Sequence, residues 1–195
     1  QNVISSTALY GGTYNLFAHT FPQYGLTVRF ADHRDPASFE KLIDAKTRAI
    51  FCESVGNPAG NITDFAALAE VAHRHGIPLI VDNTVPSPYL CRPFEHGADL
   101  LFHSATKFLS GHGTVVGGVL VDSGRFDWQA SGQFPELTEP YAGFHGMVFA
   151  EESTVGAFLL RARREGLRDF GACMSPHTAW LILQGLETLP LRMAR

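Results

Sequence analysis

The feature that most constrains the fold is a regular alternation of short apolar segments with segments of helical character between Val3 and Val121. The apolar segments are rich in β-branched and aromatic residues, and several lack the polar alternation of a half-exposed strand. We expect strands at residues 3–4, 26–30, 49–52, 77–81, 100–102 and 116–121. Buried strands that are separated by helices are typical of a mostly parallel sheet covered on both faces. The sequence therefore predicts an α/β fold.

Helix signals fill the segments between and after these strands. We expect helices at residues 13–21, from Asp35, from Thr63, at 147–164 and at 177–186. Asp35 precedes Pro36, which is a typical start of a helix, and Thr63 is placed to cap the clearest helix of the chain. Residues 122–146 form a long loop, and loops of this length in compact domains are usually functional or lie at an interface.

The composition limits the class of protein. Only 17% of the residues are charged, against roughly 25% in typical globular proteins, which fits a sheet buried on both faces or a surface covered by a partner subunit. The net charge of -4 gives no sign of nucleic-acid binding, and no segment approaches the apolar length of a membrane span. The three cysteines are too scattered for a disulfide framework, which predicts reduced thiols in a cytoplasmic protein.

Residues 99–109, Asp-Leu-Leu-Phe-His-Ser-Ala-Thr-Lys-Phe-Leu, carry the strongest chemical signal. An apolar run changes abruptly into small hydroxyl residues and Lys107. A lysine at the mouth of a buried strand is expected to be partly desolvated, which favours the neutral and nucleophilic amine. Ser104 and Thr106 offer hydroxyl donors of the kind that a phosphate accepts. The segment indicates an amine that bonds to a carbonyl beside a bound phosphate; a plain surface lysine is the alternative.

Reactive side chains also follow other predicted strands. Glu53 ends one strand, Asp82 and Thr84 follow the next, and Tyr10 ends the loop after the first. Ligands of open parallel sheets bind beyond the carboxyl ends of the strands, so we expect these residues to share a pocket with Lys107. A phosphorylated pyridine aldehyde requires this set: an amine, a carboxylate for the ring nitrogen, a stacking aromatic and hydroxyls for the phosphate.

Each of these residues, taken alone, also has a structural interpretation. Asp82 could cap the following turn, and Tyr10 alone fits a core residue better. Asn57 belongs to an Asn-Pro pair, which usually forms a turn, and Glu53 fits an ion-pair partner slightly better. The presence of Lys107 at the next strand end is what favours a functional site. No metal-ligand spacing, nucleotide fingerprint or hydrolase motif is present in the sequence, so we expect no metal.

Four segments together resemble the Cys/Met-metabolism family of pyridoxal-phosphate enzymes, which have the aspartate-aminotransferase fold. They are Tyr-Gly-Gly-Thr at 10–13, Glu-Ser-Val-Gly-Asn-Pro at 53–58, Val-Asp-Asn-Thr at 81–84 and His-Ser-Ala-Thr-Lys-Phe-Leu-Ser-Gly-His-Gly at 103–113. The resemblance covers essentially the whole chain, and the order and spacing of the segments make it specific.

The resemblance implies a role for each residue in binding pyridoxal 5'-phosphate. Lys107 would form the covalent link to the cofactor, Asp82 would hold the pyridine nitrogen, and Tyr10 would stack on the ring and take part in catalysis beside Lys107. The other implied roles are phosphate donation by Ser104 and Thr106 and contact near the ring hydroxyl by Asn57 and Thr84.

The loop at residues 135–146 is similar to that of the branch of this family that carries out γ-replacement on O-acetylhomoserine. The resemblance implies conversion of O-acetyl-L-homoserine and sulfide, or a thiol, to homocysteine, or methionine, and acetate by a homo-oligomer that is a dimer of dimers. A γ-lyase acting on cystathionine or methionine and a sulfhydrylase using O-succinylhomoserine share the same residues. A non-catalytic fragment is the alternative of another class.

Both ends of the sequence read as cuts through a longer chain. Residues 1–5 start almost inside a strand-like run, and residues 189–195 end on a mixed apolar and basic stretch. Family members carry an N-terminal arm, a Gly-rich phosphate loop and a C-terminal domain with an arginine for the substrate carboxylate, and this sequence contains none of them. We expect residues 1–195 to be the central, cofactor-binding large domain.

Overall fold

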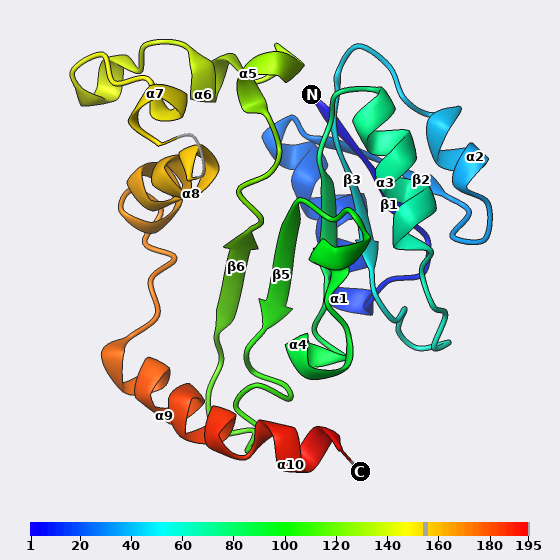
Figure 1. The fold of residues 1–195 in the computed structure, drawn as a ribbon, viewed down its shortest axis with the longest axis vertical. Coiled ribbons are helices and arrows are strands. Elements are labelled where there is room, and N and C mark those ends of the chain that lie inside the picture. The colour runs from blue at the N-terminus through cyan, green and yellow to red at the C-terminus, as the bar shows by residue number, and fades with distance from the viewer. Residues whose placement is uncertain (154–155, 195) are drawn as a thin grey trace.

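The computed structural model describes residues 1–153 and 156–194, and a six-stranded sheet forms its centre (Figure 1). The strand order is β2-β1-β3-β4-β5-β6, with the first five strands parallel and β6 antiparallel to β5. The strands are β1 (Asn2–Ser6), β2 (Thr27–Ala31), β3 (Thr47–Glu53), β4 (Leu79–Asp82), β5 (Leu100–Ser104) and β6 (Gly118–Asp122). All six predicted strands are present, which confirms the mostly parallel sheet.

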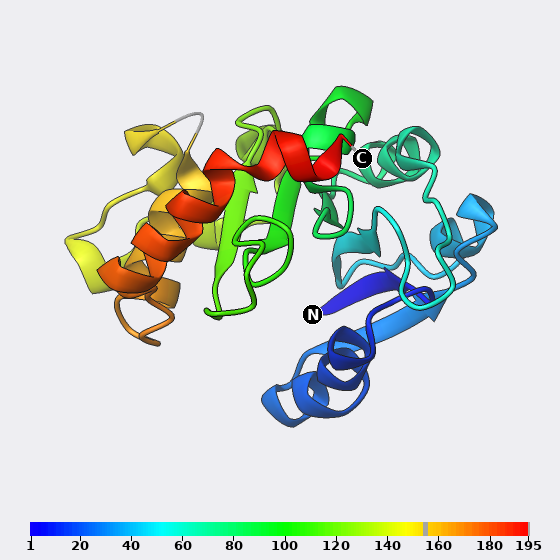
Figure 2. The ribbon, with the colours of Figure 1, turned by 90° about the horizontal axis from the view of Figure 1, so that it is seen from below.

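Helices cover both faces of the sheet, as the absence of polar alternation predicts. The helices α2 (Pro36–Glu40) and α3 (Phe65–Arg74) pack on one face, and the main core between them and the sheet includes the fully buried Phe39, Ile50 and Leu79. A continuous helical run lies on the other side (Figure 2). It consists of α1 (Gly11–Asn15), η1 (Leu16–Thr20) and η2 (Phe21–Tyr24).

The segment after β6 forms a second, smaller core. It contains α5 (Trp128–Ser131), α6 (Pro135–Thr138) and η4 (Ala142–Phe144), which are followed by α7 (Phe149–Glu152). Trp128, Leu137 and Phe149 are buried there against Leu100 of β5. The long loop predicted at 122–146 is therefore packed by its own aromatic side chains, and it lies beyond the amino ends of the parallel strands (Figure 1).

Three helix predictions need correction. Asp64, not Thr63, caps α3: its side chain accepts the Ala67 N–H at 3.1 Å, while the Thr63 hydroxyl donates to the Glu53 carbonyl at 2.6 Å. The first helical run does not end at residue 21, as predicted, but continues through Pro22 to the left-handed Gly25. The single helix predicted at 147–164 is wrong, because three short elements occupy this region: α7, α8 (Ala157–Arg161) and η5 (Ala162–Leu167).

The break in that predicted helix has a packing explanation. Ser153 ends α7 with an extended backbone, and residues 154–155 lie outside the described part of the chain. Phe149 of α7 and Ala157 of α8 are both buried in the second core. In one straight helix, residues eight apart would point in directions that differ by roughly 80°. Separate short helices bury both side chains in one cluster.

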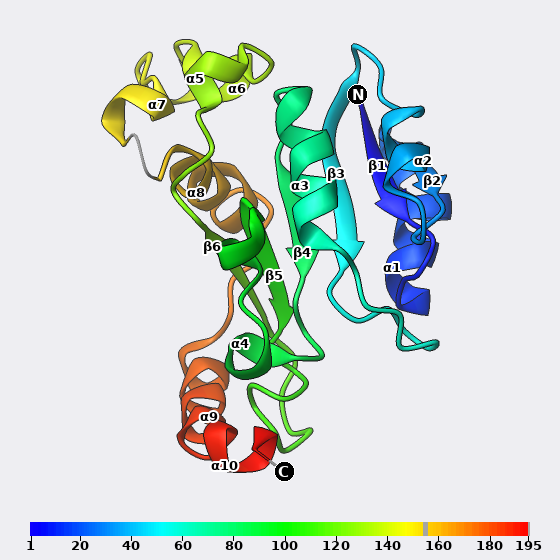
Figure 3. The same ribbon diagram turned by 45° about the vertical axis from the view of Figure 1, so that its right-hand side comes forward.

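The last two helices cross the edge of the sheet at which the parallel strands end (Figures 1 and 3). They are α9 (Pro176–Glu187), which confirms the helix predicted at 177–186, and α10 (Leu189–Met193). The short α4 (Ser87–Leu90) and η3 (Pro93–His96) connect β4 to β5, with α4 in contact with α10 and η3 in contact with α3. Within residues 1–153 and 156–194, no helix has the length and apolar character needed to cross a membrane, and no His/Cys/Asp/Glu cluster could hold a metal.

The main core provides a direct test of this packing. Ile50 is fully buried in β3, whereas Ile62, in the following loop, is 75% exposed. Removing a buried Ile side chain loses its transfer free energy and leaves a cavity, so Ile50→Ala should lower the free energy of unfolding by about 3 kcal/mol. Ile62→Ala should change it by less than about 0.5 kcal/mol. Urea denaturation measures both, and equal losses would contradict the assigned core.

Candidate functional site

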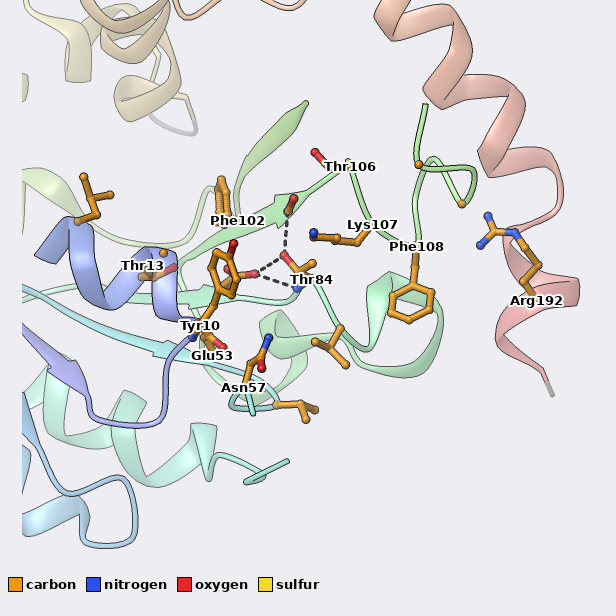
Figure 4. Close-up of a pocket in the computed structure, with 18 residues that line it drawn as sticks. Tyr10, Thr13, Glu53, Asn57, Thr84, Phe102, Thr106, Lys107, Phe108 and Arg192 are labelled. Atoms are coloured by element: carbon orange, nitrogen blue, oxygen red, sulfur yellow. Dashed lines mark hydrogen bonds between the residues drawn. The ribbon is translucent and has the colours of Figure 1, made fainter. Parts of the chain in front are cut away.

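A cavity of about 760 Å³ opens beyond the carboxyl ends of the parallel strands (Figure 4). The chain leaves the adjacent β1 and β3 in opposite directions across the sheet, which creates a crevice at this edge. All seven residues predicted for the site line this cavity: Tyr10, Asn57, Asp82, Thr84, Ser104, Thr106 and Lys107. The sheet therefore brings them together from four different loops.

Asp82 is held by hydrogen bonds that connect two strand ends. Its Oδ1 accepts the backbone N–H of Thr84 at 2.9 Å and also the hydroxyl of Thr84. The same Thr84 hydroxyl oxygen accepts the backbone N–H of Ser104, at the end of β5, at 2.8 Å. Asp82 does cap its own turn, as the structural interpretation expects, but its carboxyl group also faces the cavity. The two interpretations are compatible.

The electrostatic surroundings of Asp82 leave room for a cation. Burial raises the pKa of Asp82, and this effect exceeds the opposite influence of the Thr84 hydrogen bonds and of nearby His103. Burial likewise lowers the pKa of His103. Among the described residues, no Lys or Arg forms an ion pair with Asp82. A positively charged group placed against this carboxylate would supply a charge that the protein lacks there.

Glu53 is a cavity residue whose role the sequence did not reveal. It is buried at the end of β3, beside Asp82 in the register of the sheet, and its Oε1 accepts the backbone N–H of Tyr10 at 2.6 Å. Burial raises the pKa of Glu53 to about 7, with a further contribution from the nearby Asp82. The predicted ion pair is wrong, because Glu53 forms none within the described part of the chain.

Tyr10 presents its ring to the cavity and is not a core residue. The side chain is 53% exposed, and the residue immediately precedes α1. Gly12 leaves room for this ring, since a Cβ at that position would lie 2.5 Å from Cε1 of Tyr10. The hydrogen bond from the Tyr10 backbone to Glu53 fixes the loop on which the ring stands. The ring is therefore positioned as one wall of the cavity.

Lys107 lies on the turn that follows β5, and its side chain extends into the cavity toward Thr84 (Figure 4). The backbone of the turn is fixed by bonds from the Lys107 N–H to the Ser104 carbonyl at 3.2 Å and from the Gly111 N–H to the Lys107 carbonyl at 2.8 Å. Lys107 is exposed, so the expectation of partial desolvation by the strand is wrong in this structure.

The hydroxyl of Thr106 is engaged with the backbone at the start of β6. It donates to the Gly117 carbonyl at 3.3 Å and accepts the Gly117 N–H at 3.1 Å. The cavity has further walls that the sequence analysis did not identify: Thr13, Phe102, Phe108 and Arg192. Phe102 could have been expected there, because it lies on the predicted strand before Lys107, and in the sheet it pairs in register with Asp82 and shares its face. Arg192 is 85 positions beyond Lys107 and carries no local signal.

The chemistry of this donor set fits pyridoxal 5'-phosphate. An exposed primary amine, a half-buried carboxyl group and an aromatic ring line one cavity, together with the side chains of Ser104 and Thr106. In the described part of the chain, no Lys or Arg forms an ion pair with that carboxyl group. An amine bonds to an aldehyde, a carboxylate holds a protonated ring nitrogen, and a ring stacks on the pyridine. The cavity is also of the size that small-molecule and cofactor sites have, roughly 300–1,000 Å³.

The raised pKa of Glu53 predicts a pH-dependent stability. A carboxyl group whose pKa rises from 4.5 to about 7 on folding binds its proton more tightly in the folded protein, so the folded state loses stability as the pH rises across this interval. The free energy of unfolding of Glu53→Gln, measured relative to that of the parent, should therefore increase by about 2 kcal/mol from pH 5 to pH 8. Urea midpoints of the cofactor-free proteins measure this difference.

The matched control for this prediction is Glu70→Gln on α3. The Glu70 side chain is 78% exposed, so its replacement should give the same small difference from the parent at both pH values. A Glu53→Gln protein whose stability relative to the parent is also independent of pH would contradict the assigned burial of the carboxyl group.

The chain matches known proteins along its whole length. A family model described as "Cys/Met metabolism PLP-dependent enzyme" matches residues 1–195. An O-acetyl-L-homoserine sulfhydrylase of Leptospira meyeri is 50% identical over an alignment of 203 positions that covers 100% of this chain and 46% of that protein. A homocysteine synthase of Schizosaccharomyces pombe is 52% identical over an alignment of 197 positions, which again covers 100% of this chain and 46% of the relative. The chain thus spans about half the length of these relatives.

Solved structures show the same fold. A crystal structure of an O-acetylhomoserine (thiol)-lyase from Campylobacter jejuni, which contains N'-pyridoxyl-lysine-5'-monophosphate, has a TM-score of 0.94 and 39% identity, covering 98% of this chain and 47% of that one. Cystathionine gamma-lyase from Lactobacillus plantarum has a TM-score of 0.73 and 31% identity, covering 98% and 42%. The predicted fold class is thereby confirmed. The family match, together with these likenesses, shows that the chain belongs to the Cys/Met-metabolism family of PLP-dependent enzymes.

Proposed function

We propose that residues 1–195 are the central pyridoxal-phosphate-binding large domain of an enzyme that converts O-acetyl-L-homoserine and sulfide, or a thiol, to L-homocysteine, or methionine, and acetate. The observation that carries the proposal is the meeting of Asp82 and Lys107, from successive strand ends, in one cavity. The names of the relatives at 50% and 52% identity support the choice of reaction within the family.

Lys107 is the residue that bonds to the cofactor and moves protons. Lys107 is exposed and lines the cavity, where its amine would reach both a cofactor aldehyde and a bound amino acid. In the proposed reaction, the amine takes the proton from the substrate Cα and returns protons to the product. When it is bound, pyridoxal phosphate supplies an electron sink for the charge left on the substrate.

Asp82 and its neighbours orient the reacting groups. The carboxylate of Asp82 would hold a proton on the pyridine nitrogen, and Thr84 fixes the direction of that carboxylate through its hydroxyl and its N–H. Tyr10 provides a ring on which the pyridine would stack. Ser104 and Thr106 would donate to the phosphate, Thr106 by turning its hydroxyl away from the Gly117 carbonyl, and Asn57 and Thr84 would lie near the ring hydroxyl. Preorganised polar groups of this kind are usually a large part of catalysis.

The overall conversion needs no oxidant or reductant. The bond between Cγ and the acetate oxygen breaks, a bond between Cγ and sulfur forms, and the proton from the sulfur donor balances the acetate that leaves. The role of this chain is to control the protons at Cα and the neighbouring carbons, which Lys107 Nζ does, and to hold the cofactor so that the leaving group departs from an activated substrate.

The second candidate is γ-elimination, and the likeness to a cystathionine gamma-lyase is the observation in its favour. The higher TM-score of the O-acetylhomoserine lyase, 0.94 against 0.73, favours γ-replacement. Purified full-length protein should form homocysteine from O-acetylhomoserine and sulfide faster than it releases a keto acid from cystathionine or methionine. Faster homocysteine formation from O-succinylhomoserine than from O-acetylhomoserine would change the proposed acyl group from acetyl to succinyl. Keto-acid release without homocysteine formation would make the enzyme a lyase.

The cellular setting and the assembly belong to the same proposal. Free cysteines at 52, 91 and 173 are consistent with a cytoplasmic protein. Large exposed apolar side chains, including Phe170 at 86% and Tyr24 at 78%, support a homo-oligomer, which we propose to be a tetramer built from dimers. Analytical ultracentrifugation of the full-length protein tests the assembly, and a monomer would contradict it.

The role of Lys107 can be tested against that of two other lysines, because residues 1–195 contain Lys41, Lys46 and Lys107. Lys107→Ala should lose the visible absorbance band of lysine-linked cofactor and all measurable homocysteine formation, because no other amine lines the cavity in the described chain. Lys46→Ala is the matched control and should keep both. A Lys107→Ala protein that retains the band would remove the central assignment.

A further inference from the structure

The turn that carries Lys107 packs against α9 and α10, the last two helices of the chain. Ala105 and Leu109, two positions before and two after Lys107, are both buried. They pack in one apolar cluster with Ile182 of α9 and Leu189 of α10. The backbone around Lys107 thus owes its position to residues that lie more than 70 positions further along the chain.

The contact between Gly185 of α9 and the backbone of Ser110 is particularly close. A Cβ at Gly185 would overlap the carbonyl oxygen of Ser110 and would lie 2.7 Å from its Cα. Glycine inside a helix costs about 1 kcal/mol relative to alanine, so the close approach explains why a side chain is absent there. Ser110 is itself buried, and its N–H and hydroxyl donate to the carbonyls of Ala105 and Thr106 at 3.0 and 3.1 Å.

Arg192 in α10 joins the helices to the other side of the same turn. Its Nη2 donates to the Gly185 carbonyl at 2.8 Å, and its Nε donates to the Thr188 hydroxyl at 3.1 Å. The guanidinium lies against Gly111, where a Cβ would be only 2.5 Å from Cζ of Arg192. Gly111 has a left-handed backbone, and its N–H donates to the Lys107 carbonyl at 2.8 Å.

Figure 4 shows Arg192 entering the cavity from α10, on the side of Phe108 and opposite Tyr10. A planar guanidinium can hold two acceptors in fixed directions and present a flat face to a neighbour, which an ammonium cannot do. Here the two acceptors belong to α9 and to the α9–α10 junction, and the flat face meets Gly111. The arrangement uses the shape of arginine in addition to its charge.

We propose that Arg192 is a positioning residue for Lys107. It holds residues 105–111 against α9 and α10 and so fixes where the amine stands over the cofactor. The proposal rests on the proposed function for the identity of the group that Lys107 meets, but the restraint on the turn itself does not. A displacement of about 1 Å in a reacting group can cost on the order of 10²-fold in rate.

The first test measures the turn without any cofactor chemistry. In the full-length protein, Arg192→Gln and Arg192→Lys should both increase amide hydrogen exchange at residues 105–111 by about tenfold or more, since local opening becomes easier. Arg34→Gln is the matched control, because Arg34 is exposed and does not line the cavity. It should leave the exchange of these residues unchanged.

The second test measures the amine against pyridoxal phosphate. Cofactor-free Arg192→Gln and Arg192→Lys should regain the visible band about tenfold more slowly than the parent after addition of pyridoxal phosphate, and the pH midpoint of the band should shift. Gly185→Ala should cause the same changes by pushing Ser110 away from α9. It serves as the independent variant should the Arg192 proteins fold poorly.

The outcomes separate the possible roles of Arg192. Normal exchange and normal band formation in Arg192→Lys, with defects only in Arg192→Gln, would show that the positive charge matters and would overturn the positioning role. Normal behaviour of all three variants would also overturn it, while leaving the proposed function intact. A parent protein that forms no band would overturn the proposed function, and the exchange data would then still decide whether Arg192 restrains the turn.

Discussion

The parallel register of the central strands is the constraint on which the rest of the structure depends. Glu53 pairs with Asp82, and Asp82 pairs with Phe102, so side chains from three consecutive strands form one row on the same face. Because parallel strands all end at one edge, the turns that follow them meet there. Four sequence segments that are far apart thus contribute to one cavity without any dedicated binding domain.

Burial at this edge makes the ionised forms of the two carboxyl groups in the row, Glu53 and Asp82, unfavourable in the cofactor-free protein. Glu53 and Asp82 both have raised pKa values, mainly because burial disfavours their charged forms. The charge of Asp82 raises the pKa of Glu53 further, whereas the Thr84 hydrogen bonds and His103 only partly offset the effect of burial on Asp82. Functional sites often carry such strain, and the structure around them must compensate. The apolar core beneath β3 and β4 provides that compensation through Ile50, Leu79 and Val81.

Much of the fold and the core of the site could be predicted because their signals are local. Apolar runs identified the strands, and Asp82 and Lys107 stand directly after two of them. Features that depend on distant partners could not be predicted. The burial that makes Glu53 a support for Tyr10 arises from the sheet, and Arg192 reaches the cavity only because α10 crosses its edge. The break near residue 153 reflects packing of Phe149 and Ala157 into one cluster.

The most direct test of the central claim is to locate the cofactor on the chain. Full-length protein incubated with pyridoxal phosphate, reduced with borohydride and digested should yield one modified peptide, which mass spectrometry assigns to Lys107. The predicted result is a pyridoxyl phosphate mass increase on the peptide that contains residues 104–109 and none on those with Lys41 or Lys46. Modification of either of those two lysines instead, with Lys107 unmodified, would contradict the assignment of the site.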